Sequence, residues 1–430
     1  MLKDKNIYLV PCLGFLVIIL VGWILLMLPV CSNGNITPFN AFFTAVSATC
    51  VNGLSTVNLS KDYTFLGQII IAINTEVGAI GFVAFVSFLL NFKKKKMTIS
   101  ETLLLSSALN DDNYGKLKQK LREVIKYTLV IELIGAILLA VDFIPRFGIK
   151  DGIWYSIFHS ITAFCNAGFD IIGDSSLTIF AKNIYVNMVF IMLMVLGSIG
   201  YFVIEDIITC MKKRNFSHIG FNTKIVLTAS GIIYAISIIL IKIAQPNLTW
   251  LETIFTSVTA RTTGFTTINM EEILPVTKLL ISFLMIIGGA PGSTSGGIRI
   301  TSIAILVLIV RATLRNKKDI VVYYKKIDLR TIRQAITNIC ICCLLVLISM
   351  FIMEKVQVMR LDNNLFMCAS AFSATGLSVT NLASMNFLSK AILTGLMYIG
   401  RVGPISILSI LILKKKENQN IEYVSGSVML

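Results

Sequence analysis

The sequence predicts an all-α polytopic membrane protein with four pseudo-symmetric repeats, each a helix, a re-entrant pore loop and a second helix. Of its 430 residues, 55% are hydrophobic and only 14% are charged, whereas soluble domains are about 25% charged. The mean hydropathy is +0.81. A short motif recurs four times, and a second glycine follows each copy at a similar distance. The composition therefore indicates a membrane protein, and the recurrence indicates the repeats.

Each copy of the motif has a phenylalanine, a run of small or hydroxyl-bearing residues, and a glycine followed by a large apolar residue. Four degenerate copies at matching spacing can surround one axis, which predicts a single pathway at the centre. The motif glycines are Gly53, Gly168, Gly264 and Gly376, and the second glycines lie 25, 29, 24 and 24 residues further on, at Gly78, Gly197, Gly288 and Gly400.

The third copy, residues 249–269, illustrates the local structure expected of all four. Residues 251–260 have the pattern of a short amphipathic helix, which stops at the turn Thr262-Thr263-Gly264-Phe265. This helix is too short to span a bilayer, which requires roughly 20 residues, and long apolar segments flank it. Non-helical backbone is tolerated at membrane depth only where protein buries it or where it lines a water-filled path. The segment is therefore expected to be a re-entrant pore loop.

The apolar segments predict eight spanning helices and four re-entrant pore helices around one ion pathway. The spanning helices are expected at residues 7–28, 63–92, 121–144, 179–210, 222–244, 274–310, 331–353 and 387–413. The four repeats then cover residues 1–96, 121–214, 215–316 and 331–416, with cytoplasmic links at 97–120 and 317–330 and a cytoplasmic tail at 417–430.

The net charge of +15 is concentrated in a few places. Of the 38 Lys and Arg residues, 26 fall in six segments that the repeat pattern places on one side of the membrane. The positive-inside rule makes that side cytoplasmic, so both termini are expected inside the cell and the pore loops open outside. This distribution argues for a cell-membrane protein surrounded by lipid and against a nucleic-acid partner. The basic segments are 3–5, 93–96, 116–126, 212–224, 311–333 and 414–416.

The four motif loops have the composition of a cation filter. Backbone carbonyls can replace the water shell of a cation, and glycine permits the conformations that point successive carbonyls at one axis. The pore helices, expected to end at residues 49, 164, 260 and 373, would direct partial negative charge inward. Tight turns between packed helices are the alternative, which four turns in register make less favourable. The candidate filter residues are Val51, Asn52, Gly53, Asn166, Ala167, Gly168, Thr262, Thr263, Gly264, Ala374, Thr375 and Gly376.

The second helix of repeat three contains a polar, glycine-rich interruption at residues 288–297. Five glycines and a proline would cost several kcal/mol in a helix interior, and apolar residues on both sides place the interruption at mid-membrane. A hinge or a gate across the pathway is expected, with a merely kinked helix as the alternative. Arg401, at the equivalent depth in repeat four, is expected to contact this loop. The candidate gate residues are Gly288, Gly289, Gly292, Ser293, Thr294, Ser295, Gly296, Gly297 and Arg401.

Other reactive or ionisable residues give weaker indications. Glu76 could attract cations or make a structural hydrogen bond, and the sequence leaves both interpretations open. Arg261 is expected to brace its pore loop, and His159 to be packed in its pore helix. Cys31 and Cys50 could approach each other, but a disulfide between them is not favoured. No catalytic set of Ser, His and Asp and no metal-ligand spacing is present, so an enzyme is not expected.

These motifs resemble the Trk/Ktr/HKT superfamily of potassium transporters, and the resemblance extends over essentially the whole chain. The most specific segments are Arg261-Thr262-Thr263-Gly264-Phe265, residues 288–301, and Gly400-Arg401-Val402-Gly403-Pro404. With eight spans and no additional leading helices, the chain is most similar to KtrB, the membrane subunit of the bacterial Ktr systems.

The resemblance implies potassium uptake through a channel-like path that the intramembrane loop of repeat three gates. It also implies a homodimer and a cytosolic regulatory ring of the KtrA type, which binds ATP and ADP, on the basic inner face. Potassium would be the substrate and sodium an activating ion, with no cofactor bound to this chain. The chain departs from the family pattern at Glu76, where glutamine is usual, and in its tail, which lacks the expected proline and terminal glycine.

An alternating-access cation symporter, coupled to sodium or protons or permeable to sodium, is the second hypothesis. Symporters with discontinuous helices at the midplane tend to have two broken helices in inverted repeats. The sequence instead shows four repeats in the same direction and indicates one broken helix. The channel-like pathway is therefore the favoured hypothesis.

Overall fold

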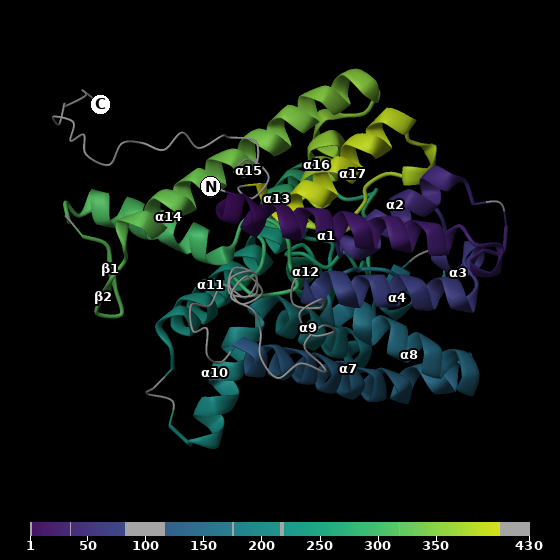
Figure 1. Cartoon of the computed structure of the whole chain (residues 1–430), viewed down its shortest axis with the longest axis horizontal. Helices are drawn as coiled ribbons and strands as arrows, with labels where there is room; N and C mark the ends of the chain where they lie inside the picture. Colours follow the sequence, from purple (N-terminus) through teal and green to yellow (C-terminus); the bar gives the residue numbers. More distant parts are fainter. Residues whose placement is uncertain are drawn as a thin grey trace.

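The computed structural model describes residues 2–34, 36–81, 117–173, 176–215, 219–317 and 319–404. Most of the predicted link 97–120, the tail 417–430, the basic segments 93–96 and 414–416 and the last parts of two predicted spanning helices lie outside the described residues. Within them, helices joined by loops form the structure, with one short hairpin of strands (Figure 1).

Repeats one and two each begin with a long helix, continue through a shorter pore helix and an extended loop, and return in a second helix. In repeat one these are α1 (Leu2–Leu26), η1 (Pro29–Cys31), α2 (Pro38–Thr49), α3 (Leu59–Asp62) and α4 (Phe65–Ile80). In repeat two they are α7 (Leu117–Phe147), α8 (Ile149–Phe164), η3 (Ser176–Phe180), α9 (Ile184–Ile199) and α10 (Tyr201–Lys212).

Repeats three and four have the same order of elements. Repeat three has α11 (Phe221–Ala244), α12 (Trp250–Thr259), α13 (Pro275–Ile286) and α14 (Ile300–Leu314). Repeat four has α15 (Leu329–Val356), α16 (Leu361–Ser373), η5 (Leu382–Ser384) and α17 (Phe387–Val402).

Local sequence signals account for the ends of the pore helices. Thr37 caps α2 by accepting a hydrogen bond from the Asn40 amide, and Pro38 occupies the first turn, where its missing N–H has no cost. Thr249 and Glu252 form a reciprocal capping box at the start of α12. The helices end at Thr49, Phe164, Thr259 and Ser373, so the predicted ends agree in three repeats and differ by one residue in repeat three.

The pore helices are buried, and the long helices around them are not. In α16, every residue from Phe366 to Ser373 is buried. In contrast, within an apolar stretch of 18 residues in each of α1, α7, α11 and α15, only 22–28% of the residues are buried. Their apolar side chains, such as Leu13, Ile137 and Leu344, are exposed. A helix that is hydrophobic all round yet exposed is suited to lipid, so the four long helices surround a core made of pore helices.

Among the described residues, four helices are long and apolar enough to cross a membrane, or five if α9 and α10 count as one broken span. Three further apolar helices, α4, α13 and α14, are shorter. The described segments therefore show a polytopic helical membrane protein, and the eight spanning helices that the sequence predicts stay a prediction.

The prediction of one continuous helix over residues 179–210 was wrong. Helix α9 ends at Ile199, and α10 starts at Tyr201 after a bend of 101°. Gly200 lies between them at φ +94°, a conformation that is accessible to glycine and ends a helix. Apolar residues on both sides concealed this break in the sequence. Helices α4 and α17 likewise end at glycines with positive φ, Gly81 and Gly403.

A two-stranded hairpin, β1 (Val321–Val322) and β2 (Lys325–Lys326), lies in the predicted link 317–330. The strands are antiparallel, with Val321 opposite Lys326 and Val322 opposite Lys325. Tyr323 and Tyr324 form the turn at φ +46° and +61°, the handedness that two-residue hairpins require. The hairpin and the end of α10 project on the side opposite α3 (Figure 1).

Candidate functional site

The four motif loops share one backbone conformation. In every loop the first residue of the triplet and the glycine have positive φ, and the residue between them does not. Glycine adopts positive φ without steric cost, and the recurrence of this pattern makes the four loops alike in backbone conformation. The φ angles are 58°, 60°, 115° and 56° at Val51, Asn166, Thr262 and Ala374, and 95°, 61°, 96° and 84° at Gly53, Gly168, Gly264 and Gly376.

The four glycines lie in a closed ring, each against the next repeat. In each case, a Cβ placed on the glycine would collide with the carbonyl oxygen that precedes the next glycine in the ring. The backbones are therefore too close for any side chain, and the contacts run from repeat one through two, three and four back to one. The distance from the added Cβ to the carbonyl oxygen is 2.1 Å for Gly53 and Ala167, 2.2 Å for Gly168 and Thr263, 2.2 Å for Gly264 and Thr375, and 2.1 Å for Gly376 and Asn52.

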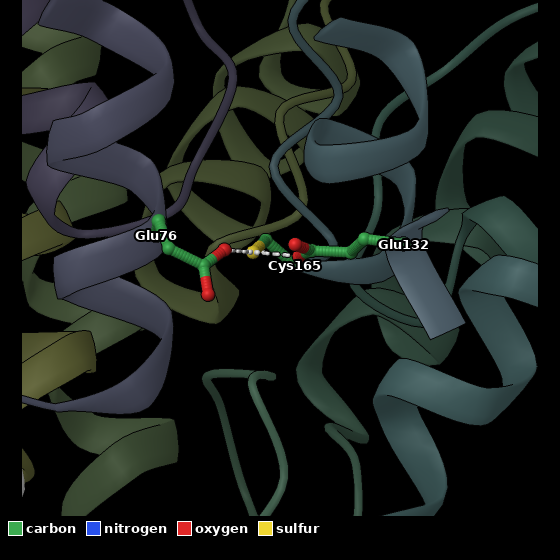
Figure 2. Close-up of side chains that lie close together, drawn as sticks. All are labelled: Glu76, Glu132 and Cys165. Atoms are coloured by element: carbon green, nitrogen blue, oxygen red, sulfur yellow. Dashed lines mark hydrogen bonds between the residues drawn. The ribbon is translucent and has the colours of Figure 1, made fainter. Parts of the chain in front are cut away.

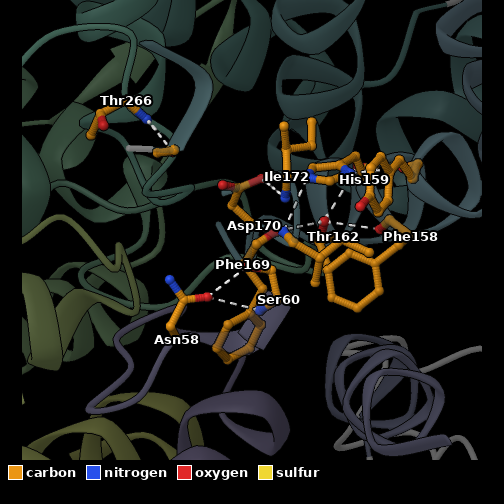
Figure 3. Close-up of polar contacts among 12 residues, drawn as sticks. Asn58, Ser60, Phe158, His159, Thr162, Phe169, Asp170, Ile172 and Thr266 are labelled. Atoms are coloured by element: carbon orange, nitrogen blue, oxygen red, sulfur yellow. Dashed lines mark hydrogen bonds and ion pairs between the residues drawn. The ribbon is translucent and has the colours of Figure 1, made fainter. Parts of the chain in front are cut away.

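Hydroxyl groups of the pore helices hold these loops in place. In repeat three, Thr259 Oγ1 accepts from the Gly264 amide at 3.1 Å and donates to the Phe265 carbonyl at 2.7 Å. In repeat two, Thr162 Oγ1 donates to the Phe169 carbonyl at 3.3 Å (Figure 3). The serines and threonines of the motif are thus explained, because a buried loop must satisfy its backbone polar groups.

Side-chain amides connect neighbouring repeats. Asn52 Nδ2 donates to the carbonyl oxygens of Ser370 and Ala371 at 3.1 and 3.0 Å, which joins the first loop to pore helix α16. The Asn166 amide group lies 2.7 Å from Thr263 Oγ1. Both asparagines are buried. Asn52 joins the first loop to a pore helix, and Asn166 joins the second loop to the third.

A depression of about 630 Å³ lies above the ring, on the side of the loops that follow the motif glycines. All four motif glycines line it, together with Asp170 and Glu271. His159 Nε2 lies 2.7 Å from Asp170 Oδ1 and contacts aromatic rings on several sides (Figure 3). The packed position expected for His159 is therefore present, and its contact positions an acidic group at the depression.

The second glycines support the pore helices from below in repeats one, two and four. A Cβ on Gly78, Gly197 or Gly400 would lie 2.0, 1.9 or 1.8 Å from the carbonyl oxygen of Thr49, Phe164 or Phe372, respectively. These are the last carbonyls of the pore helices or close to them. Gly288 is different, because its Cβ would meet the Gly296 carbonyl of its own loop at 1.9 Å.

The interruption in repeat three is a loop without helix between Ile286 and Ile300, in agreement with the sequence. The two ends of the loop are hydrogen-bonded to each other. The Ile298 amide donates to Ile286 O, and the Gly288 amide donates to Ile298 O. Its tip contacts the other repeats. Thr294 Oγ1 donates to Gly197 O at 3.2 Å, and Ser295 Oγ accepts from Thr262 Oγ1 at 2.7 Å. The loop therefore lies directly beneath the motif loops.

Arg401 contacts this loop, as expected, and also repeat one. Its guanidinium donates to Thr294 O, to Gly78 O at 2.5 Å and to Ala79 O at 3.2 Å. Carbonyl partners of this kind are what a basic group within the membrane requires. Arg299 instead donates to carbonyls of its own loop, at Ala290 and Ser295. Arg401 thus connects three repeats, whereas Arg299 acts within one.

Arg261 braces the pore loop of repeat three, as the sequence suggested. It is 1% exposed, donates to Gly288 O at 3.1 Å and lies 4.5 Å over the Tyr234 ring. Glu76 contacts Cys165 rather than the ring of glycines. Cys31 and Cys50 are both free thiols.

Sequence reasoning located the motif loops but missed two features of the site. The first is the positive φ at the non-glycine residues that open each triplet, which no residue type signals. The second is that helices α4, α9 and α17, in repeats one, two and four, each end just after the second glycine. A signal for it existed, because Gly81, Gly200 and Gly403 each follow the second glycine by three residues.

The chain matches the family model described as TrkH, a cation transport protein, over residues 16–423. The chain belongs to this TrkH family. It is 33% identical to the potassium/sodium uptake protein NtpJ of Enterococcus hirae, over 97% of the chain and 95% of that protein. It is 30% identical to the Ktr system potassium uptake protein B of Bacillus subtilis, over 97% of the chain and 95% of that protein.

The fold agrees with this TrkH family membership. The crystal structure of the potassium transporter TrkH from Vibrio parahaemolyticus superimposes with a TM-score of 0.75, covering 95% of this chain and 85% of that one at 16% identity. The TrkH family is a family of membrane ion transporters, so the chain is a cation transporter of the Trk and Ktr type.

Proposed function

We propose that the chain mediates potassium uptake through a channel-like pore, whose filter is the ring of four glycine loops. The observation that carries this proposal is the closed cycle of backbone contacts among Gly53, Gly168, Gly264 and Gly376. Such contacts place four copies of one loop around a common centre. Four equivalent loops can provide carbonyl oxygen ligands from all directions, which a dehydrated cation requires.

The charge distribution around the ring favours a cation. All four pore helices end at the loops, so the negative ends of their dipoles face the centre. The triplets contain no carboxylate, so selection would depend on carbonyl dipoles. The depression above the ring has acidic residues, Asp170 and Glu271, at its wall, and such charges raise the local concentration of cations. The names of the relatives support potassium as the substrate and make sodium the competitor to test.

The gate in this proposal is the loop of residues 288–297 with Arg401. The loop lies beneath the motif loops and contacts repeats two and four as well as its own repeat. A positive guanidinium below the ring opposes cation passage while the loop is closed. The cyclic, same-direction order of the four repeats supports a pore rather than inverted halves that alternate.

The proposed topology is that of eight membrane crossings, with both termini in the cytoplasm of a cell-membrane protein. The ends of α10 and α14 and the hairpin β1–β2 are basic. We place a cytosolic regulatory ring of the KtrA type, which binds ATP or ADP, on this face, with the chain itself as a homodimer and sodium as an activating ion. The Ktr names of several relatives, among them the protein of Vibrio alginolyticus, support a system with partner subunits.

Growth of a bacterium without potassium uptake systems, at submillimolar potassium, tests this function. We expect rescue by the wild-type chain with a co-expressed Ktr regulatory subunit and loss of rescue by Gly264→Asp. A Cβ at Gly264 would collide with Thr375 O, and the carboxylate would enter the ring. Gly231→Ala is the matched control, because a Cβ there meets no atom within 4 Å.

Uptake into proteoliposomes separates potassium from sodium. We expect potassium influx to exceed sodium influx through the wild-type chain and both to be lost with Gly264→Asp at equal protein content. If Gly264→Asp still rescued growth, the glycine ring would not be part of the ion pathway. Absence of uptake by well-expressed wild-type chain, with and without the regulatory subunit, would contradict the proposed function.

A further inference from the structure

Two glutamates and a cysteine from three different helices meet beside the second motif loop. Glu76 comes from α4, Glu132 from α7, and Cys165 is the residue after the end of α8. Cys165 Sγ lies 3.2 Å from Glu76 Oε2 and 3.7 Å from Glu132 Oε1, between the two carboxyl groups (Figure 2). One ligand atom from each residue lies within 4.8 Å of the other two.

This cluster is buried and has polar atoms without partners. Glu132 is 6% exposed and Cys165 is 0% exposed, and Glu76 is partly accessible. Glu76 Oε1 has no hydrogen-bond partner among the described residues. The Tyr201 hydroxyl, on a side chain more than nine-tenths buried, has none within the described part of the chain either. Tyr201 lies near all three members of the cluster and near Thr128.

Within the described segments, neither Glu76 nor Glu132 forms an ion pair with a basic side chain. Two carboxylates this close repel each other, and burial penalises each negative charge. The arrangement therefore requires protons or a cation between the oxygens. Arg401 lies near Cys165 and Tyr201, but its hydrogen bonds go to backbone carbonyls.

The thiol determines which class of cation fits best. Hard ions such as Mg²⁺ prefer oxygen ligands alone, whereas a thiolate selects softer divalent ions. Zinc is bound by Cys sulfur at about 2.3 Å and by carboxylate oxygen at about 2.0–2.2 Å, commonly with three protein ligands and one open position. Ligand atoms within 4.8 Å of one another reach such distances with small movements of side chains.

We propose that Glu76, Glu132 and Cys165 form an intramembrane site for a thiophilic divalent cation of the Zn²⁺ or Cd²⁺ class, and that the bound ion restrains potassium flux. The ion would join α4, α7 and the end of α8. Glu76 lies two residues before Gly78, whose carbonyl accepts from Arg401. Cys165 directly precedes Asn166 of the second motif triplet. A metal ion here would therefore stiffen both the filter and the contact with the gate.

Binding of Cd²⁺ to the purified full-length chain, measured by equilibrium dialysis, tests the site without reference to transport. We expect one ion per chain with the wild type. Because each ligand atom is lost, Cys165→Ser and Glu132→Gln should each weaken binding by about tenfold or more. Glu76→Gln, which keeps size and shape in the most accessible of the three residues, should do the same.

Cys50→Ser is the matched control. Cys50 follows the end of pore helix α2 as Cys165 follows the end of α8, and it is equally buried. Its electrostatic partner is Arg401 rather than a carboxylate. We expect this variant to bind Cd²⁺ as the wild type does. Equal affinity in Cys165→Ser, or no stoichiometric binding to the wild type, would overturn the site.

The effect on flux rests on the proposed function and has its own readout. Micromolar Cd²⁺ should inhibit potassium uptake into proteoliposomes with the wild-type chain and with Cys50→Ser, and inhibition should require at least about tenfold more Cd²⁺ with Cys165→Ser. Stoichiometric binding without inhibition would overturn the restraint on flux while the site stands. If the wild-type chain takes up no potassium in the absence of Cd²⁺, the proposed function fails, and the dialysis result still decides the site.

Discussion

The glycine ring and the level just beneath it differ in their symmetry. In the ring, all four repeats present the same φ pattern and the same contact with the next repeat. One level down, Gly78, Gly197 and Gly400 support pore helices, whereas Gly288 packs against its own loop. In the proposed function the ring coordinates the ion, which needs equivalent ligands around a centre, and the symmetry of the ring fits that role. The proposed gate needs one element that differs from its surroundings, and the loop of repeat three is the element that differs.

The level beneath the glycine ring also shows how a loop can take the place of a helix within the membrane. In repeats one, two and four, helices α4, α9 and α17 each end at a single glycine, Gly81, Gly200 or Gly403. Repeat three instead has thirteen residues between α13 and α14, whose backbone groups bond to Ser198, Gly197 and to each other. Such backbone is tolerated at this depth because protein surrounds it.

The largest expected effect is from alanine in the ring. At Gly53, Gly168, Gly264 or Gly376 alone, alanine should reduce potassium uptake by at least about tenfold, because positive φ costs an L-residue roughly 1–2 kcal/mol and the Cβ collides with a backbone carbonyl. Uptake per amount of chain in proteoliposomes measures this. Gly231→Ala should have no effect. If alanine at one of the four positions leaves potassium uptake unchanged, the four glycines are not equivalent in function.

Alanine at the second glycines should separate stability from gating. Gly400→Ala places a Cβ 1.8 Å from Phe372 O and should lower the free energy of unfolding by about 1–3 kcal/mol, the cost of overpacking. Gly288→Ala should change uptake more than stability, because its collision is within the gate loop. Thermal unfolding in detergent and uptake would be measured together. Gly395→Ala, in the same helix as Gly400 with open space around it, is the control.

Loss of Arg401 should open the gate. Arg401→Gln removes a positive charge and the contacts with Thr294 and Gly78, so uptake without a regulatory subunit should rise by about fivefold, the lower range of typical couplings. Arg299→Gln should raise it less, since the hydrogen bonds of Arg299 among the described residues lie within its own loop. A larger rise with Arg299→Gln would mean that the link between repeats does not hold the loop closed.

The smallest effect should come from the loss of one hydrogen bond between two loops of the ring. Thr263→Val removes the hydroxyl that contacts Asn166 at 2.7 Å. A buried hydrogen bond contributes about 1 kcal/mol, so the ratio of potassium to sodium uptake should fall by a few-fold while total uptake persists. Competition between the two ions in proteoliposomes measures the ratio. Thr313→Val, which loses only a bond within exposed helix α14, should leave the ratio unchanged.

Much of the candidate site was visible in the sequence because its signals are local. The ends of the pore helices were placed within one residue, since they depend on caps, glycines and hydroxyl-bearing residues nearby. The continuous helix 179–210 was predicted wrongly because hydropathy is the same on both sides of Gly200. The hairpin at Tyr323 and Tyr324 was also missed, since neither residue favours positive φ.

By itself, the sequence determined the membrane class, the four copies and the polar loop of repeat three, because composition and spacing along the chain carry that information. The tertiary structure decided which glycine faces which carbonyl, that Arg401 joins repeat one to the loop, and that Glu76, Glu132 and Cys165 meet. These depend on the approach of segments far apart in the chain. Packing of helices around the pore helices sets those distances, and no local pattern records them.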